Sequence, residues 1–132
     1  MQTSKEFLLS IERKIKKKGE IDEQFLEYLE VIFPNKTNNV LEVIRKGITK
    51  NIYSPSNRIV WCAAGEKGRH LVYPKLYCDC QDFYKNVIVK RKRLFCKHLM
   101  AQVICEVLGG FQINKYEDKE FGMFLKEIQS NF

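Results

Sequence analysis

The sequence has no long apolar run and no secretory signal pattern at its start. Because a membrane-spanning helix needs about 20 apolar residues in succession, we expect no membrane association and no secretion by that route. Internal repeats, low-complexity tracts and linkers are also missing, and 132 residues fit one domain. We therefore expect a single domain over residues 1–132 that works inside the cell, in the cytoplasm of a prokaryote or the nucleus of a eukaryote.

The sequence is also poor in histidine, the side chain that most often acts as a general acid or base in enzymes. It has two histidines, of which His98 belongs to the cluster described next and His70 lies in a predicted strand. The stretch 65–68, Gly-Glu-Lys-Gly, lacks the six-residue glycine span and the Lys-Ser/Thr ending of a phosphate-binding loop. We therefore expect a protein that is not an enzyme, so that any ATP hydrolysis comes from a partner.

Four side chains of metal-binding type stand in two tight pairs. They are Cys78 and Cys80 and then, after fifteen intervening residues, Cys96 and His98. Three thiolates and one imidazole make a complete tetrahedral ligand set for zinc, and because protein fills every position such an ion is structural. The alternative is that the cysteines are merely small buried core residues. Two pairs with one-residue gaps, one of them ending in His, favour one structural Zn²⁺.

The one-residue gaps predict where each pair lies. Residues two apart in a strand share a face, so Cys78 and Cys80 are expected at the end of a strand. Residues two apart in a helix diverge, so Cys96 is expected just before or in the first turn of a helix. The sequence has five cysteines, an odd number that argues for a reducing compartment. Cys62 and Cys105 fall in apolar stretches and are predicted to be core residues without a disulfide.

The remaining pattern predicts an α+β fold with N-terminal helices, a three-stranded antiparallel β-meander, the zinc site and then helices. Thr3 and Glu6 have capping-box spacing, and Gly19 is typical of a helix stop. Three more helices are predicted before and between the ligand pairs: one that starts near Asp22 and ends before Pro34, one over Asn39–Lys46, and a short one over 81–89. Strands are predicted over 48–53, 58–64 and 69–77, and Pro74 is a candidate break in the last. A further helix begins at Cys96 and is ended by Gly109 and Gly110, and a final helix lies near 117–129.

The chain thus divides into three predicted parts. Residues 1–47 form a helical N-terminal part, 48–110 hold the strands, the zinc finger and the following helix, and 111–132 form a C-terminal helix. The core of the N-terminal helices is not expected to need the ion, so those helices are expected to survive its removal.

The positive charge is concentrated around the second ligand pair. The net charge is +7, and residues 85–98 hold six basic and no acidic side chains: Lys85, Lys90, Arg91, Lys92, Arg93 and Lys97. Such a cluster is typical of contacts with nucleic-acid phosphates, with Tyr84 or Phe95 available to stack on bases. A solvated basic loop or a nuclear import signal would look the same. A stand-alone nucleic-acid-binding zinc finger that uses the basic loop 85–97 is therefore an alternative function.

The pattern Cys-x-Cys followed by Cys-x-His resembles the SWIM-type zinc finger. It stands here as Leu-Tyr-Cys-Asp-Cys-Gln-Asp-Phe over 76–83 and Phe-Cys-Lys-His-Leu-Met-Ala over 95–101. Ala101, three residues past the histidine, is similar to the extended motif of the small SWIM proteins that pair with RecA-family recombinase paralogues in Shu-type complexes. This resemblance implies that Cys78, Cys80, Cys96 and His98 hold zinc. It implies no particular residue for contacts with DNA.

The same resemblance implies an accessory or adaptor role in homologous recombination DNA repair. The expected partners are a RecA-family recombinase paralogue and single-stranded DNA, on which the recombinase assembles. A candidate docking element is the final helix, where Phe121, Phe124, Leu125 and Ile128 recur at helical spacing. The alternative is that these four side chains complete the core.

Overall fold

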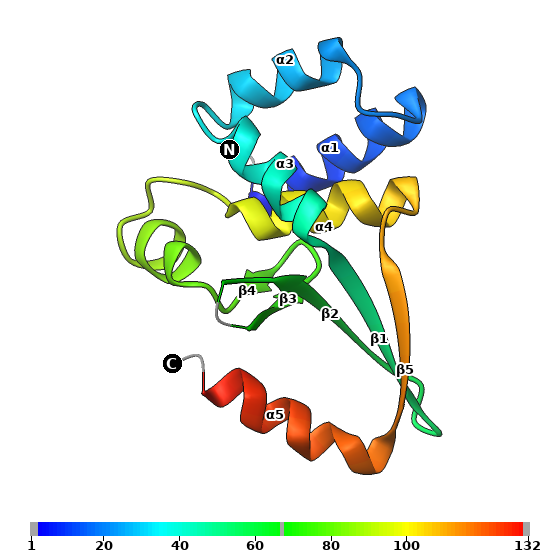
Figure 1. Cartoon of the computed structure of the whole chain (residues 1–132). Helices are drawn as coiled ribbons and strands as arrows, with labels where there is room; N and C mark the ends of the chain where they lie inside the picture. Colours follow the sequence, from blue (N-terminus) through cyan, green and yellow to red (C-terminus); the bar gives the residue numbers. More distant parts are fainter. Residues whose placement is uncertain (1–2, 67, 131–132) are drawn as a thin grey trace.

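The structure is a computed structural model that describes residues 3–66 and 68–130. It is a mixed β-sheet with α1 to α4 on one face and α5 on the other (Figure 1). The elements are, in chain order, α1 (Ser4–Lys18), α2 (Glu23–Ile32), α3 (Thr37–Lys46), β1 (Ile48–Ser54), β2 (Arg58–Ala64), β3 (Arg69–Tyr73), β4 (Tyr77–Cys78), a π-helix (Phe83–Val89), α4 (Lys97–Leu108), β5 (Gln112–Glu117), a 3-10 helix (Asp118–Glu120) and α5 (Phe121–Gln129). The predicted α+β class is confirmed. Within the described ranges, no helix has the length and apolar character needed to cross a bilayer.

The N-terminal helices begin and end where their capping residues predict. The Thr3 side chain accepts from the Glu6 N–H at 3.2 Å, while the Glu6 carboxylate accepts from the Thr3 N–H at 3.4 Å. Gly19 ends α1 with φ at 78°, in the left-handed region. Asp22 caps α2 by accepting from the Phe25 N–H at 2.8 Å, and this bond lowers the pKa of Asp22. The third helix starts at 37, two residues before the predicted 39.

The predicted meander forms the middle of the sheet. β1 pairs with β2, β2 with β3 and β3 with β4, all antiparallel. The third predicted strand breaks after Tyr73, at Pro74, and resumes as β4. This break is expected because proline donates no backbone hydrogen bond. The register pairs Val72 with Cys78, so the meander delivers the first ligand pair at a sheet edge. Lys67, in the predicted turn between β2 and β3, lies outside the described residues.

The sheet has five strands rather than the predicted three, in the order β4-β3-β2-β1-β5. Residues 111–132 were predicted to form only a helix, but Gln112–Glu117 form β5, which runs parallel to β1. Ile113 and Tyr116 are the only large apolar residues in this strand. The local pattern is therefore too weak to predict a strand, because pairing with the distant β1 supplies its hydrogen bonds.

Two separate cores flank the sheet. The larger one, between the sheet and α1–α4, includes Cys105, whereas the smaller one, under α5, includes Cys62. Both cysteines are buried and free, which confirms that they are core residues. Because they lie in different cores, on opposite faces of the sheet, they cannot form a disulfide with each other.

The smaller core holds α5 against the sheet. The Tyr53 ring stacks on Tyr116 at 5.2 Å between ring centroids and meets Phe121 edge-on at the same separation. Arg69 on β3 forms a two-point ion pair with Glu127 at 2.9 and 3.0 Å, and this lowers the pKa of Glu127. Of the four residues of the candidate docking element, Phe124 and Ile128 are buried in this core, as the core alternative expects, while Leu125 is exposed.

The α5 core makes a measurable contribution to stability. Phe124→Ala is expected to lower the free energy of unfolding by about 3–5 kcal/mol, because it removes a buried ring and leaves a cavity. Met123→Ala, at the neighbouring exposed position, is the control and should change it by no more than about 0.5 kcal/mol. Urea denaturation measures both, and equal midpoints for the two variants would mean that α5 is not packed on the sheet as described.

Candidate metal centre

Cys78, Cys80, Cys96 and His98 come together at one buried point, and we call them the Cys/His cluster. Cys78 ends β4 and Cys80 follows two residues later, whereas Cys96 is the N-cap of α4 and His98 lies in its first turn. Each is at most 5% exposed. Their ligand atoms all lie within 4.8 Å of one another. The predicted positions, at the end of a strand and the start of a helix, agree with the structure.

The geometry of the Cys/His cluster fits zinc. Zinc bonds of about 2.3 Å to sulfur and 2.0–2.1 Å to nitrogen give a tetrahedron with edges of about 3.5–3.8 Å. The Cys96 Sγ and the His98 Nδ1 are 3.9 Å apart. The Nδ1 atom therefore faces the thiols and is the nitrogen that would bind the ion.

Electrostatics of the thiols also favour a cation. The hydrogen bond to Cys80 raises the pKa of Cys78, while burial raises the pKa of Cys96. Cys80 accepts from both the Cys78 thiol and the Phe83 N–H, the latter at 3.3 Å, and the bond from Cys78 lowers its pKa. Three thiolates in so small a buried space repel one another, so that binding all three requires a positive ion to offset their charge.

Asp79 sets the direction of the first ligand pair, and sequence reasoning missed it. Its Oδ1 accepts from the Leu71 N–H at 3.1 Å and lies 3.1 Å from the His70 Nδ1. The side chain thus turns toward β3, while Cys78 and Cys80 on either side of it turn toward the cluster. The bond to Asp79 raises the pKa of His70, whose ring lies 4.8 Å from that of His98. A carboxylate between two ligands was the only sequence signal for this role.

The second ligand pair is fixed by α4, the central helix of the domain. Every residue of α4 from His98 to Cys105 is buried. The helix packs against α1 and α3 on one side and against the strands on the other. One continuous core includes the ligands Cys78, Cys80 and Cys96 together with the apolar residues of α1 to α3. The apolar residues of the N-terminal helices thus share their core with three of the ligands. The expectation that these helices survive loss of the ion stays a prediction, and the shared core favours the opposite outcome.

Known proteins resemble this chain over most of its length. It is 30% identical to the zinc finger SWIM domain-containing protein 7 homolog of Dictyostelium discoideum. The alignment has 117 residues and covers 86% of this chain and 75% of that protein. The chain belongs to the SWIM-type zinc finger proteins. The mouse zinc finger SWIM domain-containing protein 7 is 29% identical over 92% of this chain and 82% of its own length. The human protein of the same name is 26% identical over 87% of this chain and 84% of its own length. No family model and no solved structure matches the chain.

Membership of the SWIM family and the Cys/His cluster support zinc binding from two directions. The family is named for a zinc finger, and the cluster has the donor types, burial and spacing that zinc requires. The residues that would hold the ion in this SWIM protein are Cys78, Cys80, Cys96 and His98.

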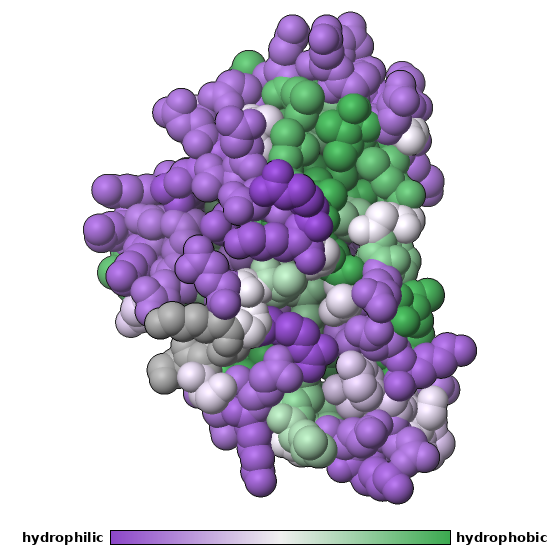
Figure 2. Space-filling model, viewed as in Figure 1, coloured by the Kyte–Doolittle hydropathy of each residue, from purple (hydrophilic) through white to green (hydrophobic). Residues whose placement is uncertain are grey.

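Five of the six predicted basic residues lie on the segment that joins the two ligand pairs, and Lys97 lies between Cys96 and His98. Lys85, Lys90, Arg91 and Lys92 are exposed, while Arg93 and Lys97 are half-buried. Arg93 also forms an ion pair with Asp82. The segment lies at the left of Figure 1, and in the same view the left side of the SWIM protein is covered mostly by hydrophilic residues (Figure 2). The segment contains a π-helix, Phe83–Val89, where a short helix was predicted.

The two candidate stacking residues differ sharply in exposure. Tyr84 is 62% exposed, as a stacking residue must be. Phe95 is buried, and its ring meets Phe33 of the N-terminal part at 5.0 Å between centroids. Phe95 is therefore a core residue and not a stacking residue, since a base cannot reach its ring.

Loss of one ligand should abolish metal binding. Cys96→Ala is expected to leave the purified SWIM protein without stoichiometric zinc, because the remaining donors no longer close the site. Cys105→Ala is the matched control, since this thiol is buried in the same core but is not in the cluster. Elemental analysis of both reduced proteins makes the comparison. Equal zinc content in the two variants would rule out Cys96 as a ligand.

Removal of the ion should loosen the N-terminal helices as well as α4. Treatment with a chelator is expected to speed amide hydrogen exchange in α1 along with α4, because both share one core with the ligands. Exchange is measured by mass spectrometry before and after chelation, with α5 in the separate core as the internal reference. Continued protection of α1 while α4 opens would contradict a shared core.

Proposed function

We propose that this protein holds one structural zinc ion and acts as an accessory subunit in homologous recombination. In this role it binds a RecA-family recombinase paralogue inside the cell and assists loading of the recombinase on single-stranded DNA. The observation that carries the proposal is family membership over most of the chain, through relatives that share its SWIM finger. The extended motif with Ala101 adds the likeness to SWIM subunits of Shu-type complexes.

The chemistry of the site supports a structural rather than a catalytic role. The four protein donors would close the coordination shell, so no position is left for a water or substrate. What the ion supplies is rigidity, because it joins the edge strand β4 to the first turn of α4. A protein with that construction suits an adaptor, whose partner recognises a fixed surface. We accordingly propose that the protein is not an enzyme.

Direct contact with nucleic acid is the second function we propose. The observation that favours it is the exposure of four basic side chains, Lys85, Lys90, Arg91 and Lys92, within eight residues. Phosphate contacts by such residues weaken as salt rises, through release of counterions. This function and the adaptor role are compatible in one protein.

Capture of the recombinase paralogue tests the adaptor role. The zinc-loaded wild-type protein is expected to retain the paralogue from the same cell in a pull-down, and so is Cys105→Ala. His98→Ala should lose it, because a missing ligand releases β4 from α4. Zinc is measured in each bait beforehand. Failure of the zinc-loaded wild type to associate with any purified paralogue of its own cell would sink the adaptor proposal.

A further inference from the structure

Three exposed tyrosines lie on β3, β4 and the π-helix, the elements on either side of Cys78 and Cys80, and we call Tyr73, Tyr77 and Tyr84 the tyrosine patch. They are 56%, 37% and 62% exposed. No other Phe, Tyr or Trp within residues 3–66 and 68–130 is as exposed. The Tyr73 and Tyr77 ring centroids are 6.2 Å apart, and Tyr77 meets Phe83 edge-on at 5.4 Å. Phe83 and Tyr84 both lie on the π-helix, so the element that carries the Tyr84 ring is the one that Tyr77 contacts.

The stretch of chain from Tyr73 to Leu94 carries most of the exposed large apolar side chains. Of the twelve exposed large hydrophobic side chains in the described ranges, seven lie between Tyr73 and Leu94. They include Ile88 and Val89, which follow Tyr84 on the π-helix at 47% and 58% exposure. Exposed apolar side chains in this number on one stretch make it a candidate binding segment.

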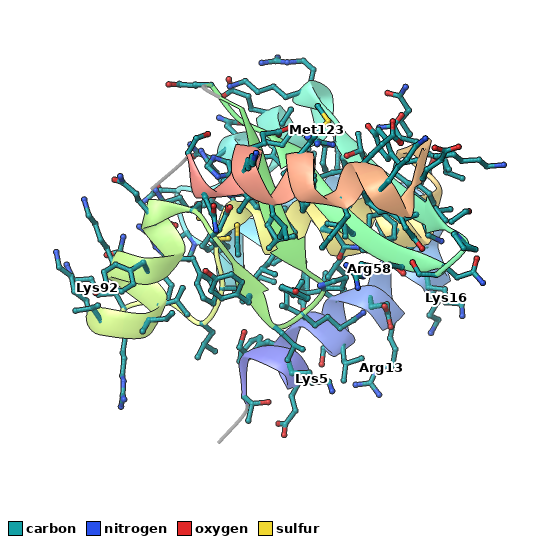
Figure 3. The ribbon with its side chains drawn as sticks, turned by 90° about the horizontal axis from the view of Figure 1, so that it is seen from below. Lys5, Arg13, Lys16, Arg58, Lys92 and Met123 are labelled. Carbon is teal, nitrogen blue, oxygen red and sulfur yellow. The ribbon has the colours of Figure 1, made fainter. Side chains whose placement is uncertain are left out.

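The charge around the tyrosine patch is positive. Residues 73–97 contain seven basic and two acidic side chains, a net charge of +5. Both carboxylates have partners within the protein: one oxygen of Asp79 accepts from the Leu71 N–H, and Asp82 accepts from Asn86 and pairs with Arg93. The basic side chains that remain outermost project into solvent, as Lys92 does at the end of the molecule in Figure 3.

We propose that the tyrosine patch and the basic residues beside it bind single-stranded nucleic acid. Bases stack on the exposed rings, while the phosphates contact Lys85 and the basic residues 90–92. Aromatic rings combined with a positive surface are the common solution for strands whose bases are unpaired. A duplex keeps its base faces inside the stack and offers mainly phosphates and base edges, so it would leave the rings without a partner. This inference rests on the nucleic-acid role proposed above and specifies its ligand and additional residues.

The metal centre holds the elements of this surface in place. Tyr77 directly precedes Cys78 in β4, the π-helix begins three residues after Cys80, and the basic segment ends at Cys96. Both ends of the surface are therefore attached to ligands. A single-stranded nucleic acid bound across the rings and the lysines would therefore contact side chains whose positions the ion keeps fixed.

Binding of labelled oligonucleotides by fluorescence anisotropy tests the inference. The zinc-loaded protein is measured with oligothymidine of about 16 nucleotides and with a mixed-sequence duplex of equal length, at several salt concentrations. Tyr84→Ala is expected to weaken oligothymidine binding roughly 5- to 150-fold and to leave the salt dependence unchanged. The control Val31→Ala removes a side chain that is 77% exposed on α2, and it should change nothing.

The triple variant Lys90→Gln, Arg91→Gln, Lys92→Gln separates the two kinds of contact. It is expected to weaken binding and also to reduce the slope of log K against log salt by about 2, since each phosphate contact on a single strand contributes about 0.7. Tyr84→Ala and the triple variant thus have different signatures. Circular dichroism checks that all variants keep the wild-type melting transition, which exposed positions should allow.

Two outcomes would overturn the inference. The first is duplex binding as tight as oligothymidine binding with no effect of Tyr84→Ala, which would leave only a non-specific charge effect. The second is absence of oligothymidine binding together with loss of the paralogue from the Tyr84→Ala bait, which would make the patch a protein-docking surface. In that second case the adaptor proposal stands. Conversely, oligothymidine binding without capture of a paralogue supports the inference and counts against the adaptor role.

Discussion

The architecture depends on three thiols and one imidazole converging where a sheet edge meets the start of a buried helix. α4 is the element that α1, α3 and the strands all contact, and its first turn supplies Cys96 and His98. Isolated zinc fingers gain about 10–16 kcal/mol of apparent free energy from their ion. A whole domain is typically stable by only about 5–15 kcal/mol. A contribution approaching that size would be comparable with the whole stability of such a domain, although 132 residues suffice for a core.

Features that depend on neighbouring residues were mostly predicted correctly, and the larger failures involve partners that are distant in the sequence. The capping residues Thr3 and Asp22, the break at Pro74 and the positions of the ligand pairs each follow from neighbours within a few residues. β5 could not be predicted, because its partner β1 lies about 60 residues earlier and pairs in parallel. The shared N-terminal core was missed for a similar reason. The apolar face of α4 was visible in the sequence, but the burial of Ala101 and Gln102 on its other sides was not.

Asp79, the residue between the ligands Cys78 and Cys80, has a structural role of its own. A buried carboxylate beside thiolates is unfavourable unless hydrogen bonds or positive charge offset it. One oxygen has the Leu71 N–H and His70 as neighbours, while the buried Oδ2 has no hydrogen-bond partner within the described residues. The charge of a divalent ion in the adjoining cluster would supply the remaining offset. The same residue therefore ties β4 to β3 and keeps its own side chain out of the cluster, so the two cysteines can face the ion together.

The basic segment between the ligand pairs is ordered by its own hydrogen bonds and by an ion pair. The Asn86 carbonyl accepts from the N–H groups of Lys92 and Arg93 at 2.8 and 3.1 Å. Asp82 accepts from the Asn86 side chain at 2.7 Å and pairs with Arg93. The segment is thus closed at its base by the ligands and at its tip by its own hydrogen bonds. Ordering a flexible chain costs free energy at the moment of binding, and a segment that is already ordered avoids much of that cost. The charges of this segment are therefore presented from an ordered backbone.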